Sequence, residues 1–353
     1  MDLPVRQLVI EEDQRKQLNH NVWSDKFVTA YLLANGVKEP IKLRYRGGHT
    51  RDYPKKSYEI VRKGKTVHLN AEFDDPSMIR NALSFRFFEW IGVPSPKTKH
   101  VLLKLNGQSL GVYLEIEAVN GAFFRRRGIP VKALMYAIND NANFGKYDPD
   151  SSRLKESLFN GYELKIGGSS DRQQLKSFIS EINSLSGSKL ETYLSKKLDV
   201  NNYLHWLAGA VFTGNYDGFD QNYAIYKHAT KGYYRMVPWD YEGTWGRNCY
   251  GNKCGSDLVR VSGYNHLTRK LLSSSRVADR YLRILGTILD KTFTVRRIQP
   301  VVEEMVERIA PHIYKDSARR WSYSVFKNEP QLIRSYIEER REIIGEAVHE
   351  RVL

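Results

Sequence analysis

Three residues with oxygen-bearing side chains, Asp217, Asn222 and Asp240, stand in an order that suits phosphoryl transfer. This chemistry needs a divalent metal held by oxygen ligands, and an acceptor near the hydroxyl that attacks. Asp217 is the candidate acceptor for the hydroxyl proton. Asn222, five positions further along the chain, and Asp240 are the candidate magnesium ligands.

The elements expected around these residues follow the order of a protein kinase active site. An apolar stripe at helical spacing covers residues 203–212, ahead of Asp217. Two aromatic and β-branched runs, 223–227 and 233–237, predict a hairpin that ends just before Asp240. Each signal alone is weak, because Asp-Gly often marks a plain turn and an acid at a strand end often serves as a cap. Their combination favours the kinase-like interpretation.

Cationic residues surround two consecutive glycines between predicted strands. Arg46, Lys55 and Lys56 are the candidate contacts to nucleotide phosphates, because flexible backbone and positive side chains together suit a phosphate. Lys56 is favoured over Lys55, since it shares a strand face with expected core residues. An ordinary exposed turn remains the alternative, because the segment is no G-x-G-x-x-G loop.

The N-terminal third of the chain is expected to form strands and one helix. The runs 28–33 and 41–45 predict a hairpin with its turn at Asn35-Gly36, and 101–116 predicts a second hairpin with its turn at Asn106-Gly107. An apolar stripe with Pro76 at its first position predicts a helix between the two hairpins.

Helical spacing dominates after about residue 120. The pattern predicts an α+β chain with an atypical protein kinase-like, two-lobed fold. Residues 1–120 would form a small antiparallel-sheet lobe with one helix, and residues 121–353 a larger, mostly helical lobe that carries the catalytic loop. The polar segment 139–152 is expected to be a loop.

Composition limits the remaining classes of protein. The 353 residues are 41% hydrophobic, enough for a real core, and a net charge of +15 favours an anionic partner, with simple solubility as the alternative. Cys249 and Cys254 form no disulfide framework or zinc site, although a single bond between them stays open. We expect no signal peptide, no membrane span and no nucleic-acid partner.

Three segments resemble the Bacillus-type CotH family of spore coat protein kinases. They are YRGGHTRDYPKKSYEI at 45–60, NYDGFDQNYAIY at 215–226 and MVPWDYEGTWG at 236–246. The likeness follows nearly the whole chain in the same order. The glycine and lysine block and the Pro-Trp-Asp block are the most distinctive parts.

The resemblance implies a Ser/Thr kinase that uses ATP and Mg²⁺, with Mn²⁺ as a possible substitute, to phosphorylate Ser-rich spore coat proteins. It implies synthesis in the mother-cell cytoplasm and later location in the coat. It also implies that Asp217 is catalytic, that Asn222 and Asp240 bind metal, and that Arg46 with Lys55 or Lys56 contacts the nucleotide. The alternative is a kinase-shaped coat scaffold without activity, which recruits other coat proteins.

The chain departs from ordinary protein kinases at several positions. Asn215-Tyr216 replaces the usual His-Arg, and Asp240-Tyr241-Glu242 replaces Asp-Phe-Gly. Glu242 is either a further metal ligand or a solvated turn residue. No glutamate can be assigned to the lysine, because Glu89 comes at the end of the expected helix and Glu72 precedes it.

Overall fold

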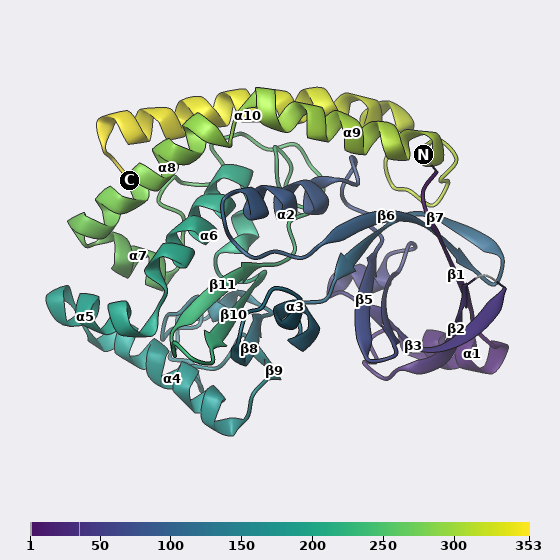
Figure 1. The fold of residues 1–353 in the computed structure, drawn as a ribbon, viewed down its shortest axis with the longest axis horizontal. Helices are drawn as coiled ribbons and strands as arrows, with labels where there is room; N and C mark the ends of the chain where they lie inside the picture. Colours follow the sequence, from purple (N-terminus) through teal and green to yellow (C-terminus); the bar gives the residue numbers. More distant parts are fainter. Residues whose placement is uncertain (1, 35) are drawn as a thin grey trace. The chain divides into compact units, whose positions relative to one another are not determined.

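A computed structural model describes residues 2–34 and 36–353 of the chain (Figure 1). It divides into two compact units. Unit 1 comprises Met1–Ala82, Pro96–Ala118 and Pro300–Pro330, whereas unit 2 comprises Leu83–Ser95, Val119–Gln299 and Gln331–Leu353. Helices and sheets are both extensive, which confirms the predicted α+β class.

The core of unit 1 is a closed barrel of seven strands, visible as a ring in Figure 1. Its order is β1-β2-β3-β4-β5-β7-β6, and it closes because β1 pairs with β2 on one side and, in parallel, with β6 on the other. The predicted small antiparallel sheet is therefore wrong. The strands are β1 (Val5–Val9), β2 (Val28–Ala34), β3 (Val37–Arg46), β4 (Ser57–Arg62), β5 (Lys65–Asn70), β6 (Thr98–Leu105) and β7 (Gln108–Glu117).

Alternating side chains explain how the barrel is filled. Ile41, Leu43 and Tyr45 on β3 are all buried in one cluster, while the residues between them face outward. The turn at Asn106-Gly107 has left-handed φ values of 48° and 82°, as a two-residue hairpin requires. The predicted turn at Asn35-Gly36 includes Asn35, which lies outside the described residues.

Helical segments complete unit 1. These are α1 (Glu12–His20), the 3-10 helix η1 (His49–Asp52), and parts of α2 (Arg80–Trp90), α9 (Val295–Ile313) and α10 (Tyr323–Glu350). The α2 helix begins later than its sequence pattern predicts. The Asp75 carboxylate accepts hydrogen bonds from the backbone N–H groups of Ser77 and Arg80, at 2.8 Å each, and so shapes the turn that leads into α2.

Unit 2 is built on a four-stranded antiparallel sheet of order β11-β10-β8-β9. The predicted hairpin is present as β10 (Tyr223–His228) and β11 (Tyr234–Pro238). Two further strands, β8 (Val131–Ala137) and β9 (Tyr162–Ile166), extend the sheet, although helices were expected in this part of the chain. The helices that lie wholly in unit 2 are α3 (Gly121–Arg126), η2 (Asp140–Ala142), α4 (Ser169–Ser184), α5 (Gly187–Lys197), α6 (Val200–Thr213), η3 (Tyr216–Gly218), α7 (His266–Leu272) and α8 (Ser275–Lys291).

A helix long and apolar enough to cross a bilayer does not occur among the described residues. The most buried helix is α6, which packs on β11: the Asn202 side chain accepts from the Met236 N–H at 2.6 Å. The start of α6 is therefore fixed on the same sheet that carries the β10–β11 hairpin.

Gly209 on α6 allows the close approach of Phe88 from α2. A Cβ at position 209 would lie 2.1 Å from the Phe88 ring. We expect Gly209→Ala to lower the free energy of unfolding, because overpacking a buried site costs about 1–3 kcal/mol. This cost exceeds the roughly 1 kcal/mol that Ala gains over Gly within a helix. Gly345→Ala on α10 is the control, since a Cβ there meets no atom within 4 Å. Denaturant unfolding should show Gly345→Ala stabilised and Gly209→Ala destabilised, and equal stabilisation of both would contradict the packing argument.

Candidate functional site

The predicted catalytic loop begins at the end of α6. Gly214 adopts a left-handed conformation with φ of 70° and ends the helix, as glycine often does at this position. The Asn215 N–H then donates to the Ala210 carbonyl at 3.1 Å, which turns the chain into η3. Asp217 is the central residue of η3 and is half-buried.

Asn222 and Asp240 lie at the same end of the β10–β11 hairpin. Tyr223 pairs with Pro238, and the Trp239 N–H donates to the Asn222 carbonyl at 3.1 Å, which extends the pairing by one step. Asn222 and Asp240 both have left-handed φ values, 58° and 57°. Asn and Asp tolerate this region better than most residues, and such backbone is often found at functional sites.

Asn215 connects the segment of Asp217 with the segment of Asp240. Its side-chain Nδ2 donates to the Asp240 carbonyl oxygen at 3.2 Å, and the residue is 3% exposed. The structure therefore brings the backbone segments of all three predicted residues, Asp217, Asn222 and Asp240, to one end of the hairpin.

Cys249 lies beside Asp217, a neighbour that the sequence did not suggest. Asp217 lies close enough to raise the pKa of its thiol, and Glu242 adds further negative charge nearby. Its backbone packs against Gly243, where a Cβ would come within 2.6 Å of the Cys249 nitrogen. Burial, followed by the charge of Asp217, raises the pKa of Cys249 to about 12. Cys249 and Cys254 are both free thiols.

This pKa makes Cys249 a reporter of the Asp217 carboxylate. We expect iodoacetamide to label Cys249 in a Cys254→Ser background about a thousandfold more slowly than a free thiol at pH 8, because only the thiolate reacts. The rate should rise as the pH approaches 12, and Asp217→Asn should raise it at fixed pH by removing the adjacent charge. Mass spectrometry of the labelled peptide measures both effects. Labelling at the rate of free cysteine would show that the thiol is neither buried nor beside Asp217.

A second acid on the loop of Asp217, Asp220, has a perturbed pKa. Burial, together with the charge of Asp140, raises the pKa of Asp220 to about 6. Lys155 lies close enough to oppose this shift, and its amine donates to the Asn143 side chain at 2.8 Å and to the Gly145 carbonyl at 2.9 Å. The polar loop expected at 139–152 is thus held by Lys155 on the side of Asp220.

The structure places the three predicted cations in unit 1. Lys55 is 4% exposed, and its amine donates to the Asp316 carboxylate at 2.9 Å and the Val112 carbonyl at 2.8 Å. Burial lowers the pKa of Lys55. The Lys56 amine donates to the Arg51 carbonyl. Arg46 donates to the Asn70 side chain and is half-buried.

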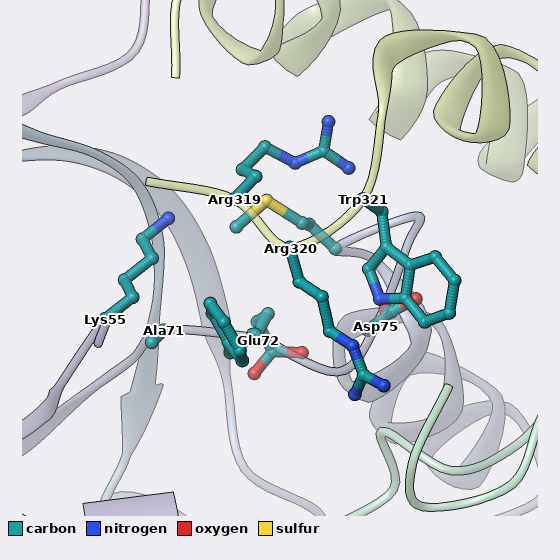
Figure 2. Close-up of a pocket in the computed structure, with 9 residues that line it drawn as sticks. Lys55, Ala71, Glu72, Asp75, Arg319, Arg320 and Trp321 are labelled. Atoms are coloured by element: carbon teal, nitrogen blue, oxygen red, sulfur yellow. The ribbon is translucent and has the colours of Figure 1, made fainter. Parts of the chain in front are cut away.

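Lys55 lines a small pocket of unit 1 (Figure 2). Glu72 lines the same pocket, and its carboxylate accepts from Asn70 at 3.0 Å and from Asn81 at 3.1 Å. The ion-pair partner of Lys55 is Asp316, which the sequence could not indicate because it is 261 positions away. Glu72 lies near enough to favour the charged form of Lys55.

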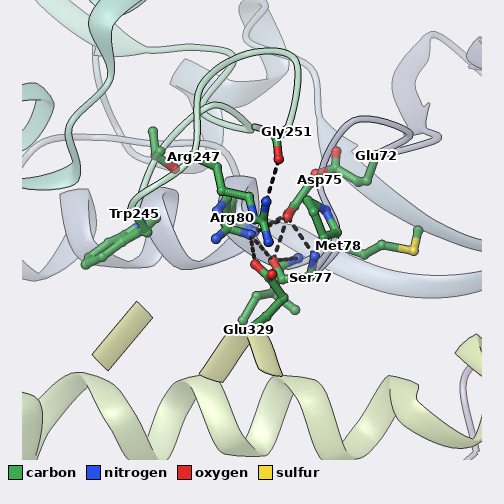
Figure 3. A network of polar contacts seen from close by, with 12 residues as sticks. Glu72, Asp75, Ser77, Met78, Arg80, Trp245, Arg247, Gly251 and Glu329 are labelled. Carbon is green, nitrogen blue, oxygen red and sulfur yellow. Dashed lines mark hydrogen bonds and ion pairs between the residues drawn. The ribbon is translucent and has the colours of Figure 1, made fainter. Parts of the chain in front are cut away.

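A buried polar network lies next to this pocket in unit 1. Arg80 is fully buried and contacts Asp75 at 2.6 Å, Ser77 at 2.9 Å and Glu329 at 2.7 Å (Figure 3). Local sequence patterns carry no sign of this arrangement, since Glu329 is remote in the chain. A buried guanidinium held by two carboxylates indicates a structural role.

The described residues include no ready-made metal site of acidic, histidine or cysteine side chains. Within residues 2–34 and 36–353, no three His, Cys, Asp or Glu side chains gather closely enough to hold a metal by themselves. Any metal at Asp240 would therefore need other donors, such as the amide oxygen of Asn222 and oxygen atoms of a bound ligand.

Comparison with known proteins gives a consistent family. The model of the family described as CotH kinase protein matches residues 43–344. The chain is 38% identical over 350 residues to inner spore coat protein H of Bacillus subtilis (strain 168), with 97% of each chain covered. It is 26% identical over 296 residues to the inner spore coat protein H-like protein of the same organism, covering 82% of this chain and 84% of that relative.

A solved structure, that of the Helicobacter pylori proinflammatory kinase CtkA, aligns with 87% of this chain and 94% of its own. The TM-score is 0.36 and the identity is 8%, too low to establish a shared fold. The family match and the relatives confirm the resemblance predicted from the three sequence segments. The chain belongs to the CotH kinase protein family.

Proposed function

We propose that this protein is an atypical Ser/Thr protein kinase that uses ATP and Mg²⁺, or Mn²⁺ in its place, to phosphorylate Ser-rich spore coat proteins during coat assembly. In this proposal the chain has a kinase-like, two-lobed fold and acts in the spore coat. The observation that carries the proposal is the meeting of the Asp217, Asn222 and Asp240 segments at one end of the β10–β11 hairpin.

Asp217 is the proposed acceptor for the proton of the substrate hydroxyl. It is half-buried on η3 and lies beside the Cys249 thiol. A positioned carboxylate that accepts this proton also orients the hydroxyl oxygen toward the phosphorus.

Asn222 and Asp240 are the proposed metal ligands. One amide and one carboxylate are hard oxygen donors of the type that Mg²⁺ prefers, and the remaining positions would be taken by phosphate oxygens and water. The residues thus fit the ion. When bound, Mg²⁺ would neutralise the charge that develops on the transferred phosphoryl group.

Arg46, Lys55 and Lys56 are the proposed contacts to the nucleotide phosphates. Arg46 and Lys56 are half-buried, whereas Lys55 would have to exchange the Asp316 carboxylate for a phosphate oxygen. Removing a buried lysine from its carboxylate is costly unless another anion takes its place. We therefore propose that Arg46 and Lys56 contribute first, and Lys55 only if Asp316 moves.

A scaffold without activity is the second candidate. It is favoured by the Lys55 amine, which already contacts a carboxylate and a backbone carbonyl, and lies 4.8 Å from the centre of the Tyr113 ring. A lysine with these partners suits a structural role. In this alternative the protein recruits other coat proteins and transfers no phosphate.

The two candidates are separated by phosphoryl transfer from γ-labelled ATP. Purified protein is incubated with Mg²⁺ and a Ser-rich peptide, and the label on the peptide is counted. The kinase proposal predicts labelled serine in an amount that grows with enzyme and time. A wild-type protein that transfers no label, with either Mg²⁺ or Mn²⁺, would contradict it and favour the scaffold.

A further inference from the structure

We propose that Asn215 is a positioning residue, whose amide holds the segment of Asp217 and the segment of Asp240 in fixed relation. The inference rests on the proposed function and deepens it. Asn215 does not touch substrate in this account. It acts through the backbone of the two segments that carry the reacting groups.

Backbone hydrogen bonds fix the main chain at Asn215. Gly214 ends α6 in a left-handed conformation, and its N–H donates to the Val211 carbonyl at 3.3 Å. The Asn215 N–H donates to Ala210, and the Asn215 carbonyl accepts from the Gly218 N–H at 3.3 Å. Hydrogen bonds therefore hold the backbone on both sides of the Asn215 side chain.

The side chain of Asn215 reaches Asp240 and is enclosed on the way. Its Nδ2 donates to the Asp240 carbonyl at 3.2 Å. Asp240 has a φ of 57°, a conformation that costs a non-glycine residue energy and persists only where its surroundings hold it. A hydrogen bond to its carbonyl is the kind of contact that holds such a residue and hence directs its side chain.

Gly218 leaves the room that the Asn215 amide needs. A Cβ on Gly218 would lie 2.7 Å from Nδ2 and 2.8 Å from Cγ of Asn215. The φ of Gly218 is not positive, so alanine suits this backbone, and the three atoms nearest to the new Cβ all belong to Asn215. Because Nδ2 is the end that holds Asp240, Gly218→Ala would displace the donor from its acceptor.

This contact gives the proposal a double-mutant test. The wild type is compared with Asn215→Ala, Gly218→Ala and the double variant, by steady-state transfer of label from ATP to the peptide and by thermal unfolding. We expect each single change to lower kcat on the order of 10²-fold, the loss that small misplacement of reacting groups produces. The KM for ATP should rise as well, because Asp240 is a proposed ligand of the metal that the nucleotide carries.

The double variant should be no worse than Asn215→Ala alone, because the amide atoms at 2.7 and 2.8 Å are then absent, and the Cβ that remains at position 215 lies farther away, at 3.2 Å. Asn183→Ala is the control. Its amide also donates to backbone carbonyls, those of Phe144 and Ile179, so its loss should lower the melting temperature and leave kcat unchanged.

Each outcome decides a separate point. A kcat near the wild-type value in Asn215→Ala, or in Gly218→Ala should the first variant not fold, overturns the positioning role. Losses that multiply in the double variant show that the two residues are not coupled, which also overturns it. If the wild type transfers no label, the proposed function is rejected instead. The melting temperatures of the wild type, the two single variants and the double variant then still report whether Asn215 and Gly218 are in contact.

Discussion

Asp217→Asn is expected to lower kcat for peptide phosphorylation by about 10²–10⁴-fold, the range typical of a lost general base. Asparagine has the size of aspartate, but its amide does not accept the hydroxyl proton. Nucleotide affinity should stay close to that of the wild type, because Asp217 is assigned to the hydroxyl and not to the metal. Label transfer and calorimetry with ATP and Mg²⁺ measure the two quantities.

Asp257→Asn is the matched control for this change, since Asp257 is an exposed aspartate in the same unit. It should leave kcat and nucleotide affinity unchanged. An Asp217→Asn protein that keeps more than about a tenth of wild-type kcat would remove Asp217 from the role of base. A loss of ATP affinity equal to the loss of kcat would instead point to a role in binding.

Glu329→Ala is expected to lower the free energy of unfolding by about 3–5 kcal/mol, the usual cost of breaking a buried ion pair on one side. Glu329 is 1% exposed and contacts the fully buried guanidinium of Arg80 at 2.7 Å. The remaining contact from Asp75 does not replace a second carboxylate, so Arg80 would keep charge that water cannot reach (Figure 3). Urea unfolding followed by circular dichroism measures the change.

The control for this prediction is Glu304→Ala. Glu304 forms an exposed pair with Arg308 at 3.2 Å, one helical turn away, and such pairs contribute about 0.3–0.5 kcal/mol. A Glu329→Ala protein as stable as Glu304→Ala would show that the buried network is not what holds this part of unit 1.

Local patterns predicted the hairpins well. Alternation on residues 41–45 and the Asn106-Gly107 turn are properties of a few neighbouring residues, and the structure has both. Barrel closure was missed because it depends on the parallel pairing of β1 with β6, which joins residues far apart in the chain. The turn at Lys63-Gly64, with φ values of 47° and 72°, joins β4 to β5, a strand that the sequence analysis did not identify.

The site shows the same division. The order of Asp217, Asn222, hairpin and Asp240 follows from spacing, and their segments meet at one end of that hairpin. The partner of Lys55 could not be found in this way, since Asp316 comes from the link between α9 and α10. Cys249 was considered only for a disulfide, because its contact with Asp217 depends on how a later loop folds back.

The most direct test of the central claim is where the metal binds. Crystals grown with ATP and Mn²⁺ would give an anomalous difference peak at the manganese. The proposed function predicts a peak within about 2.0–2.3 Å of oxygen atoms from Asp240 and Asn222 and from the nucleotide phosphates. A nucleotide-bound structure whose manganese lies away from both residues would contradict the assignment of this end of the β10–β11 hairpin as the active site.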